Sequence, residues 1–196
     1  MFARVTVTAS DLAASRGFYE TALAALGTNP WGAFAVEAGE PTRHLHIAFA
    51  ARSRGEVDAV WQAGVDAGYA GDGEPGPRPQ YTPDYYGGFL IDPDGNSVEA
   101  VHRPGRTETG SPIDHVWLGV DDLAPSRAFW EKVAPSLGLV VEDARWPGAV
   151  VVAGRHRHVM LVKDGRPPTE RVRIAIAAET ALEPTVDPHG NVVEAA

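Results

Sequence analysis

The chain has 196 residues, of which 44% are hydrophobic and 22% charged, an ordinary globular composition that excludes wholesale disorder. It has no cysteine, which excludes disulfides, zinc–thiolate sites, iron–sulfur clusters and a cysteine nucleophile. With 17 basic and 26 acidic side chains, its net charge of −9 argues against nucleic acid and anionic membranes as partners.

The first half of the chain predicts a strand, a helix and further strands. Residues 4–9 alternate with period two, as half-buried strands do, and Ser10 or Asp11 then caps a helix. Behind Ser53, a candidate N-cap, apolar residues recur at helical spacing, which predicts an additional helix over 53–69. The Gly- and Pro-rich residues 71–84 predict a loop. The tyrosines that end it indicate either a lid over a small-molecule cleft or a strand entering the core.

The second half follows a polar, breaker-rich linker at 104–111 and repeats this order with two differences. A strand over 115–120 and a helix capped by Asp121 or Asp122 are predicted again. No counterpart of the helix over 53–69 is present. In its place, two short β-rich runs within 149–162 indicate an inserted hairpin.

Three blocks of the sequence occur twice, in the same order. RVTVTASDLAASRGFYE (4–20) matches HVWLGVDDLAPSRAFWE (115–131), HLHIAFAA (44–51) matches RVRIAIAA (171–178), and DPDGNSVEA (92–100) matches DPHGNVVEA (187–195). Duplication explains three ordered blocks better than chance does. The sequence therefore predicts an α+β protein with two tandem βαβββ modules, 1–103 and 112–196.

This repeated pattern, with its helix start after the first strand and its D-P-x-G-N-x-x-E closing strand, resembles the vicinal oxygen chelate superfamily. That superfamily includes glyoxalase I, extradiol dioxygenases, fosfomycin and bleomycin resistance proteins and methylmalonyl-CoA epimerase. The resemblance implies the glyoxalase/bleomycin resistance/dioxygenase-like fold, with two modules pairing around a cleft. It also implies a divalent metal ion (Zn, Ni, Mn, Co or Fe), with ligands from the first strand and the closing-strand glutamate of each module.

Carried over by position, these ligand sites are Arg4, Glu99, His115 and Glu194. Because a guanidinium has no lone pair to give, the resemblance implies metal ligation by His115, Glu194 and Glu99. Glu99 and His115 are also the expected catalytic groups, as a proton carrier and as a ligand or general base. The alternative for Glu99 is a buried ion pair with Arg4.

Five side chains are expected to bind substrate: Arg4, His46, Trp117, Tyr85 and Tyr86. Arg4 suits a bidentate clamp on a carboxylate or phosphate. His46 makes either a cross-strand polar contact or takes the place of the missing imidazole. His156 and His158, on the predicted hairpin among arginines, indicate a solvated basic turn.

Three functions stay open. The resemblance implies first a metal-dependent lyase or isomerase acting on a small substrate through vicinal oxygens. The second is a metal-free protein that binds an antibiotic or toxin, favoured by the aromatic residues and the lost fourth ligand. The third is an extradiol-type dioxygenase, which needs His46 as its second imidazole. In each case we expect a cytoplasmic monomer or homodimer whose partner is a small molecule, with no nucleic acid and no membrane.

Overall fold

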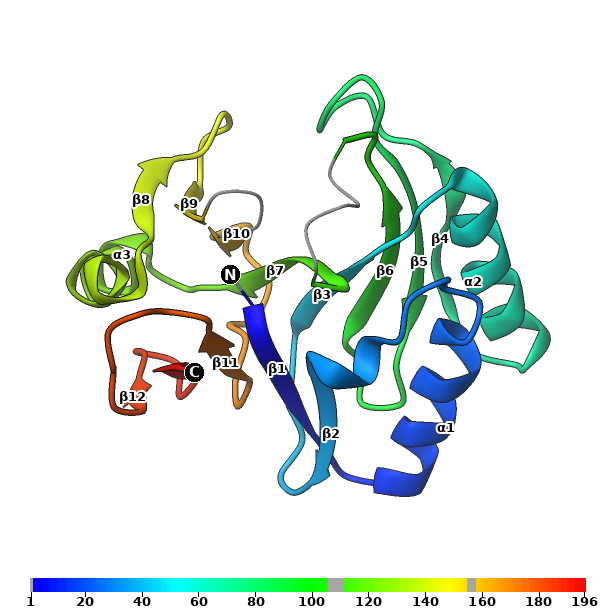
Figure 1. Ribbon diagram of the computed structural model, residues 1–196, viewed down its shortest axis with the longest axis horizontal. Coiled ribbons are helices and arrows are strands. Elements are labelled where there is room, and N and C mark those ends of the chain that lie inside the picture. Colours follow the sequence, from blue (N-terminus) through cyan, green and yellow to red (C-terminus); the bar gives the residue numbers. More distant parts are fainter. Residues whose placement is uncertain (1, 106–110, 155–157) are drawn as a thin grey trace.

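The computed structural model describes residues 2–105, 111–154 and 158–196 (Figure 1). The first half holds β1 (Phe2–Ala9), α1 (Leu12–Leu23), the short 3₁₀ helix η1 (Pro30–Gly32), β2 (Phe34–Ala38), β3 (Leu45–Ala50), α2 (Arg54–Asp66), β4 (Gly71–Pro77), β5 (Tyr86–Ile91) and β6 (Ser97–His102). The second half holds β7 (Ile113–Gly119), α3 (Leu123–Val133), η2 (Ala134–Leu137), β8 (Val140–Asp143), β9 (Ala149–Ala153), β10 (His158–Val162), β11 (Arg173–Ile176), β12 (Thr185–Val186) and β13 (Val192–Ala195). No helix in the described part of the chain is long and apolar enough to cross a membrane.

The strands form two sheets, and each sheet takes strands from both halves of the chain. The eight-stranded sheet has the order β4-β5-β6-β3-β7-β10-β9-β8, and the five-stranded sheet has the order β12-β13-β11-β1-β2. The two halves join where β3 pairs with β7 and where β1 pairs with β11, both antiparallel. The expected α+β fold with two modules is confirmed. Neither sheet belongs to one module alone, however. β1 and β2 of the first module join β11, β12 and β13 of the second, and β7 to β10 of the second join β3 to β6 of the first.

The register of the two sheets shows that they are built alike. In the eight-stranded sheet, Ala48 on β3 pairs with His115 on β7 and with Glu99 on β6. In the five-stranded sheet, Ala175 on β11 pairs in the same way with Arg4 on β1 and Glu194 on β13. The closing-strand glutamate of each module thus lies near the first strand of the other module.

The two halves meet at a pair of matching backbone contacts. The backbone N–H of Arg43 donates to the carbonyl oxygen of Glu170 (3.2 Å), and that of Glu170 donates back to Arg43 (3.1 Å). The residues that follow each of them, His44 and Arg171, both have a left-handed backbone (φ 57° and 61°). Equivalent residues therefore adopt the same unusual conformation just before β3 and just before the segment that leads into β11.

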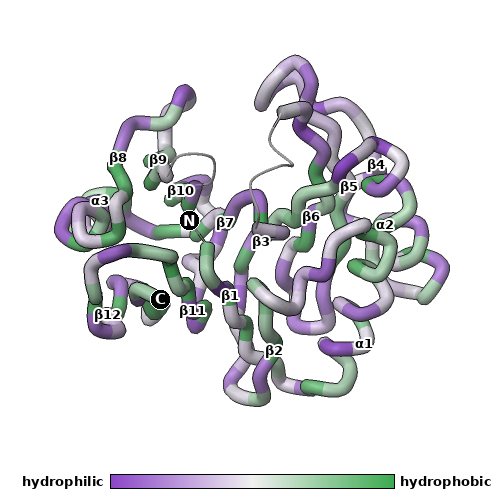
Figure 2. Tube along the Cα trace, viewed as in Figure 1, coloured by the Kyte–Doolittle hydropathy of each residue, from purple (hydrophilic) through white to green (hydrophobic). Residues whose placement is uncertain are grey.

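The helices cover the faces of the sheets that carry the apolar side chains. α2 packs on β4, β5 and β6, α3 packs on β8, β9 and β10, and α1 packs on α2 and β2 (Figure 1). The range predicted as a helix, 53–69, holds α2, and Ser53 caps it by accepting from the N–H of Glu56 (3.2 Å). Most strands are hydrophobic and most connecting loops hydrophilic (Figure 2). On β7 the alternation buries Val116 and Leu118 in the main core and turns His115 and Trp117 to the other face.

The loop predicted over 71–84 is wrong for its first half, because residues 71–77 form the strand β4. β4 lies at the edge of the eight-stranded sheet and pairs with β5 through two irregularities in register. An edge strand needs hydrogen bonds on one side only, so it tolerates Pro75 and Pro77. Asp72 and Gly73 of this strand line a cavity beside the cluster described next.

Candidate metal centre

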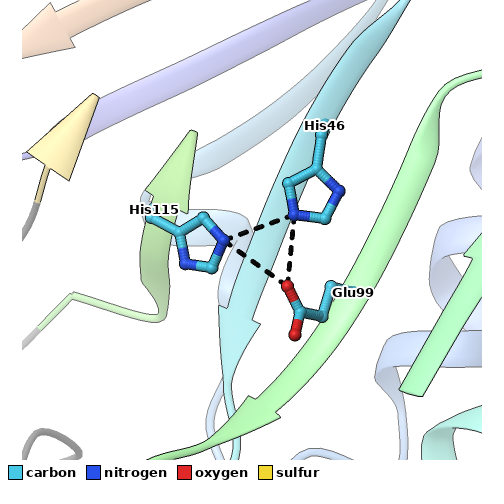
Figure 3. A group of neighbouring side chains, drawn as sticks. All are labelled: His46, Glu99 and His115. Carbon is cyan, nitrogen blue, oxygen red and sulfur yellow. Dashed lines mark hydrogen bonds and ion pairs between the residues drawn. The ribbon is translucent and has the colours of Figure 1, made fainter. Parts of the chain in front are cut away.

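His46, Glu99 and His115 come together on three adjacent strands, β3, β6 and β7 (Figure 3). His46 Nε2 lies 3.1 Å from Glu99 Oε2 and 3.3 Å from His115 Nε2, and His115 Nε2 lies 3.4 Å from Glu99 Oε2. All three side chains are buried. Among the described residues this is the one group of three or more His, Cys, Asp or Glu side chains whose ligand atoms all lie within 4.8 Å of one another.

The sheet register explains why these side chains converge. Ala48, between Glu99 and His115 on the central strand, offers only a methyl group, so the longer side chains on either side close over it. His46 lies two residues before Ala48 and therefore on the same face of β3. Three strands thus aim three donor atoms at one point.

The spacing of these donor atoms fits a metal ion. Donors about 2.1 Å from one cation lie about 3.0 Å apart at right angles and about 3.4 Å apart at tetrahedral angles. The three observed separations, 3.1, 3.3 and 3.4 Å, fall in this range. Two imidazole nitrogens and one carboxylate oxygen suit several divalent transition metals.

The outer hydrogen bonds place the hydrogen of each neutral imidazole on Nδ1, which leaves Nε2 free to ligate. His115 Nδ1 lies 2.8 Å from Asp114 Oδ1, and a carboxylate can only accept, so Nδ1 carries the hydrogen. Arg103, half-buried beside it, forms an ion pair with Asp114.

His46 is held in the same way. Ser97 Oγ donates its one hydrogen to Asp72 (2.8 Å), so it accepts from His46 Nδ1 (3.1 Å). When both imidazoles are neutral, two nitrogen lone pairs and a carboxylate oxygen therefore point to one place, where a cation would accept all three. Such carboxylate and hydroxyl partners are typical of metal-binding histidines.

The protonation states favoured by the surroundings are those of metal ligands. Burial lowers the pKa of His46, and the opposing effect of Glu99 does not overcome it, so the imidazole is neutral at neutral pH. Burial raises the pKa of Glu99, but His115 and His46 outweigh it and lower this pKa to about 2. A neutral imidazole and an ionised carboxylate are the forms that bind cations.

The two predicted tyrosines point to opposite faces of the sheet. Tyr85 is buried and donates to Glu99 Oε1 (2.8 Å), which leaves Oε2 directed at the histidines. Burial and the nearby Glu99 charge raise the pKa of Tyr85, so its hydroxyl stays a donor. Tyr86 instead donates to Asp58 on α2 (2.8 Å), away from the cluster.

This pair offers a matched test of the outer hydrogen bonds. The Tyr85→Phe protein is expected to bind Mn²⁺ about 10- to 100-fold more weakly, because Glu99 loses the donor that orients it. The Tyr86→Phe protein is expected to match the wild type. Calorimetric titration of the metal-free proteins measures both affinities, and equal weakening in the two variants would contradict this role for Tyr85.

Arg4 and Glu194 do not join the cluster, since both lie in the five-stranded sheet. Arg4 is exposed there, and Glu194 accepts from Arg173 (3.5 Å). The alternative ion pair between Arg4 and Glu99 is absent from the described residues, where Glu99 contacts His46, His115 and Tyr85 instead. The physical reason is the pairing of strands between the modules: β7 lies one strand from β6, across β3, and β1 lies one strand from β13, across β11.

His158 was wrongly predicted to lie in a solvated turn. It is the first residue of β10 and pairs in register with His115 on β7. The two imidazole rings stack with centroids 5.3 Å apart and planes 4° apart. The signal was the alternation of His158 with Met160 and Val162, which continues the strand. His156 lies outside the described residues.

Two cavities flank the cluster and share the walls formed by Trp117, Tyr81 and Tyr85. The first, of about 270 Å³, is lined by His46 and Glu99. The second, of about 320 Å³, is lined by His115 and His158. Trp117, predicted to bind substrate, therefore separates two spaces large enough for small molecules.

Comparisons with known proteins agree with this architecture. No protein-family model and no curated protein matches the chain. Among solved structures, glyoxalase I from Zea mays is similar over 99% of this chain and 91% of that chain, with a TM-score of 0.65 and 20% identity. A glyoxalase/bleomycin resistance protein from Albidiferax ferrireducens T118 aligns with 53% of this chain and 99% of its own, at 33% identity and a TM-score of 0.47. The first similarity spans both modules and shows the fold.

Proposed function

We propose that the chain, which has the fold of glyoxalase I, is a member of the vicinal oxygen chelate superfamily and a divalent-metal-dependent lyase or isomerase acting on a small substrate through two adjacent oxygens. The observation that carries the proposal is the convergence of one ligand atom each from His46, Glu99 and His115 on one point. Three protein donors leave room on the cation for two substrate oxygens. When bound, the cation would supply a Lewis acid that polarises those oxygens.

The residues around the cluster would have distinct roles. Asp114 and Ser97 hold the two imidazoles in the tautomer that ligates, and Tyr85 holds the carboxylate. Both oxygens of Glu99 are then engaged, so Glu99 ligates and does not carry protons. Asp72 is the other carboxylate that lines the first cavity among the described residues, and it is the group placed to accept a substrate proton.

A second candidate, an extradiol-type dioxygenase, is favoured by one specific observation. His46 supplies the second imidazole that this reading requires, 3.1 Å from Glu99 and 3.3 Å from His115. Two histidines and one carboxylate are the ligand set of non-haem Fe(II) oxygenases.

Turnover with defined metals separates these candidates. Metal-free protein is loaded with Zn²⁺, Ni²⁺, Mn²⁺ or Fe²⁺ and tested on hemithioacetals and epimerisable thioesters without oxygen, and on diols with an oxygen electrode. We expect conversion without oxygen, lost with a chelator and restored by adding metal back. Oxygen uptake confined to the Fe²⁺ form would establish the dioxygenase. Failure to retain any metal would contradict both and leave the metal-free binding protein.

A further inference from the structure

Arg78 places a positive charge in the cavity beside the metal cluster. It follows β4, is half-buried, and lines the 270 Å³ cavity together with His46 and Glu99. Its guanidinium carbon lies 5.4 Å from the centroid of the Phe89 ring. Within the described residues Arg78 makes no ion pair.

The chain holds this guanidinium by its backbone. Nη1 donates to the carbonyl oxygen of Pro77 (3.1 Å) and Nη2 to that of Glu74 (2.7 Å). A Cβ at Gly76 would lie 3.0 Å from Nη1, so a side chain there would press on the guanidinium. Of the five N–H donors of an arginine, these two bonds leave three for a ligand.

The other charged groups of the cavity have side-chain partners. Arg166 pairs with Asp164 (2.7 Å), Asp72 accepts from Ser97, and Glu99 contacts the histidines. The charges of Arg78 and Arg166 both act on Tyr81 in the same cavity, where they oppose the rise of its pKa caused by burial and Glu99. Arg78 is thus the arginine of this cavity that has no ion pair among the described residues.

We propose that Arg78 binds an anionic group, a carboxylate or phosphate, on a substrate whose two adjacent oxygens lie at His46, Glu99 and His115. This inference rests on the proposed function, because it places the anion on the molecule that the metal centre binds. A planar guanidinium held on one side by backbone carbonyls presents its remaining donors in a fork that matches a carboxylate or phosphate. The aromatic walls Phe89, Tyr81 and Trp117 suit a flat ring between the two ends.

The test compares probes that differ only in charge. The Mn²⁺-loaded full chain is titrated with (3,4-dihydroxyphenyl)acetate, its neutral amide and the corresponding phosphonate, each of which offers two adjacent oxygens. The wild type is expected to bind an anionic probe roughly 10- to 100-fold more tightly than the amide. The preferred anion, carboxylate or phosphonate, identifies the group. Arg78→Gln is expected to abolish this preference, and Arg78→Lys to keep part of it.

The control is Arg52→Gln, since Arg52 pairs with Glu56 outside the cavity and its loss is expected to leave the preference intact. Equal affinity of the wild type for acid and amide would overturn the inference while leaving the proposed function in place. Absence of binding by all three probes would instead overturn the proposed function. If the Arg78→Gln protein melted at a lower temperature but still bound the anionic probes more tightly than the amide, Arg78 would serve only to stabilise the backbone of residues 74–78.

Discussion

The Glu99→Gln protein is expected to lose its divalent cation, whereas Glu194→Gln is expected to keep it. The two glutamates occupy equivalent positions in the two closing strands, each paired with an alanine of the neighbouring strand. Glu99 faces two histidines, and Glu194 faces Arg173. Replacing a ligand should weaken Mn²⁺ binding by more than the roughly 10- to 100-fold that outer hydrogen bonds contribute.

Elemental analysis after dialysis, together with calorimetric titration, measures this difference. We expect about one equivalent of metal in the wild type and in Glu194→Gln, and none in Glu99→Gln. Thermal unfolding of the metal-free proteins controls for damage to the fold. If Glu194→Gln also lost its metal, the ligand set implied by the family resemblance would be right and the cluster of His46, Glu99 and His115 would be incomplete.

The Asn96→Ala protein is expected to be destabilised by about 2–6 kcal/mol, because two buried backbone groups lose their partners. Asn96 is 1% exposed; its side chain accepts from the N–H of Leu45 (3.0 Å) and donates to the carbonyl oxygen of Thr42 (3.1 Å). These bonds hold the chain at the start of β3. Leu45, its first residue, directly precedes His46. Urea unfolding followed by tryptophan fluorescence measures the change.

The repeat supplies a positive control for this result. Asn191 makes the matching bonds to Val172 (3.1 Å) and Thr169 (2.8 Å), so Asn191→Ala is expected to cost a similar amount. Asn29 is exposed and only accepts from the N–H of Trp31, so Asn29→Ala is expected to cost about 0.5–2 kcal/mol, as for other caps. Equal losses for Asn29 and Asn96 would show that these buried hydrogen bonds contribute little.

Much of the fold could be predicted from the sequence because local chemistry specified it. The alternation over 4–9, the helix behind Ser53 and the duplicated blocks depend on neighbouring residues, which a single sequence displays. The α+β class and the two-module arrangement follow from them. The loop predicted at 71–77 failed because an edge strand relaxes the rules against glycine and proline.

The site could be predicted only in part, since it depends on which strands become neighbours. Glu99 and His115 were expected as ligands because the family resemblance places ligands on the first strand and on the closing strand of each module. The local sequence does not indicate that β7 pairs with β3 or that β1 pairs with β11. These pairings bring Glu99 into contact with His115 and leave Glu194 in contact with Arg173. His46 was ambiguous for the same reason, because its role depends on Ala48 lying between the two ligand strands.

The mixed composition of the eight-stranded sheet has a thermodynamic consequence. Two of the three donors precede residue 104 and the third follows residue 111, so neither half of the chain contains the complete set. A cation that needs all three donors binds the joined state and not the separated halves. Its binding energy is then linked to the union of the halves, and raising the free metal concentration raises the free energy of unfolding by mass action. The ion would act as a reversible cross-link between two copies of one ancestral unit.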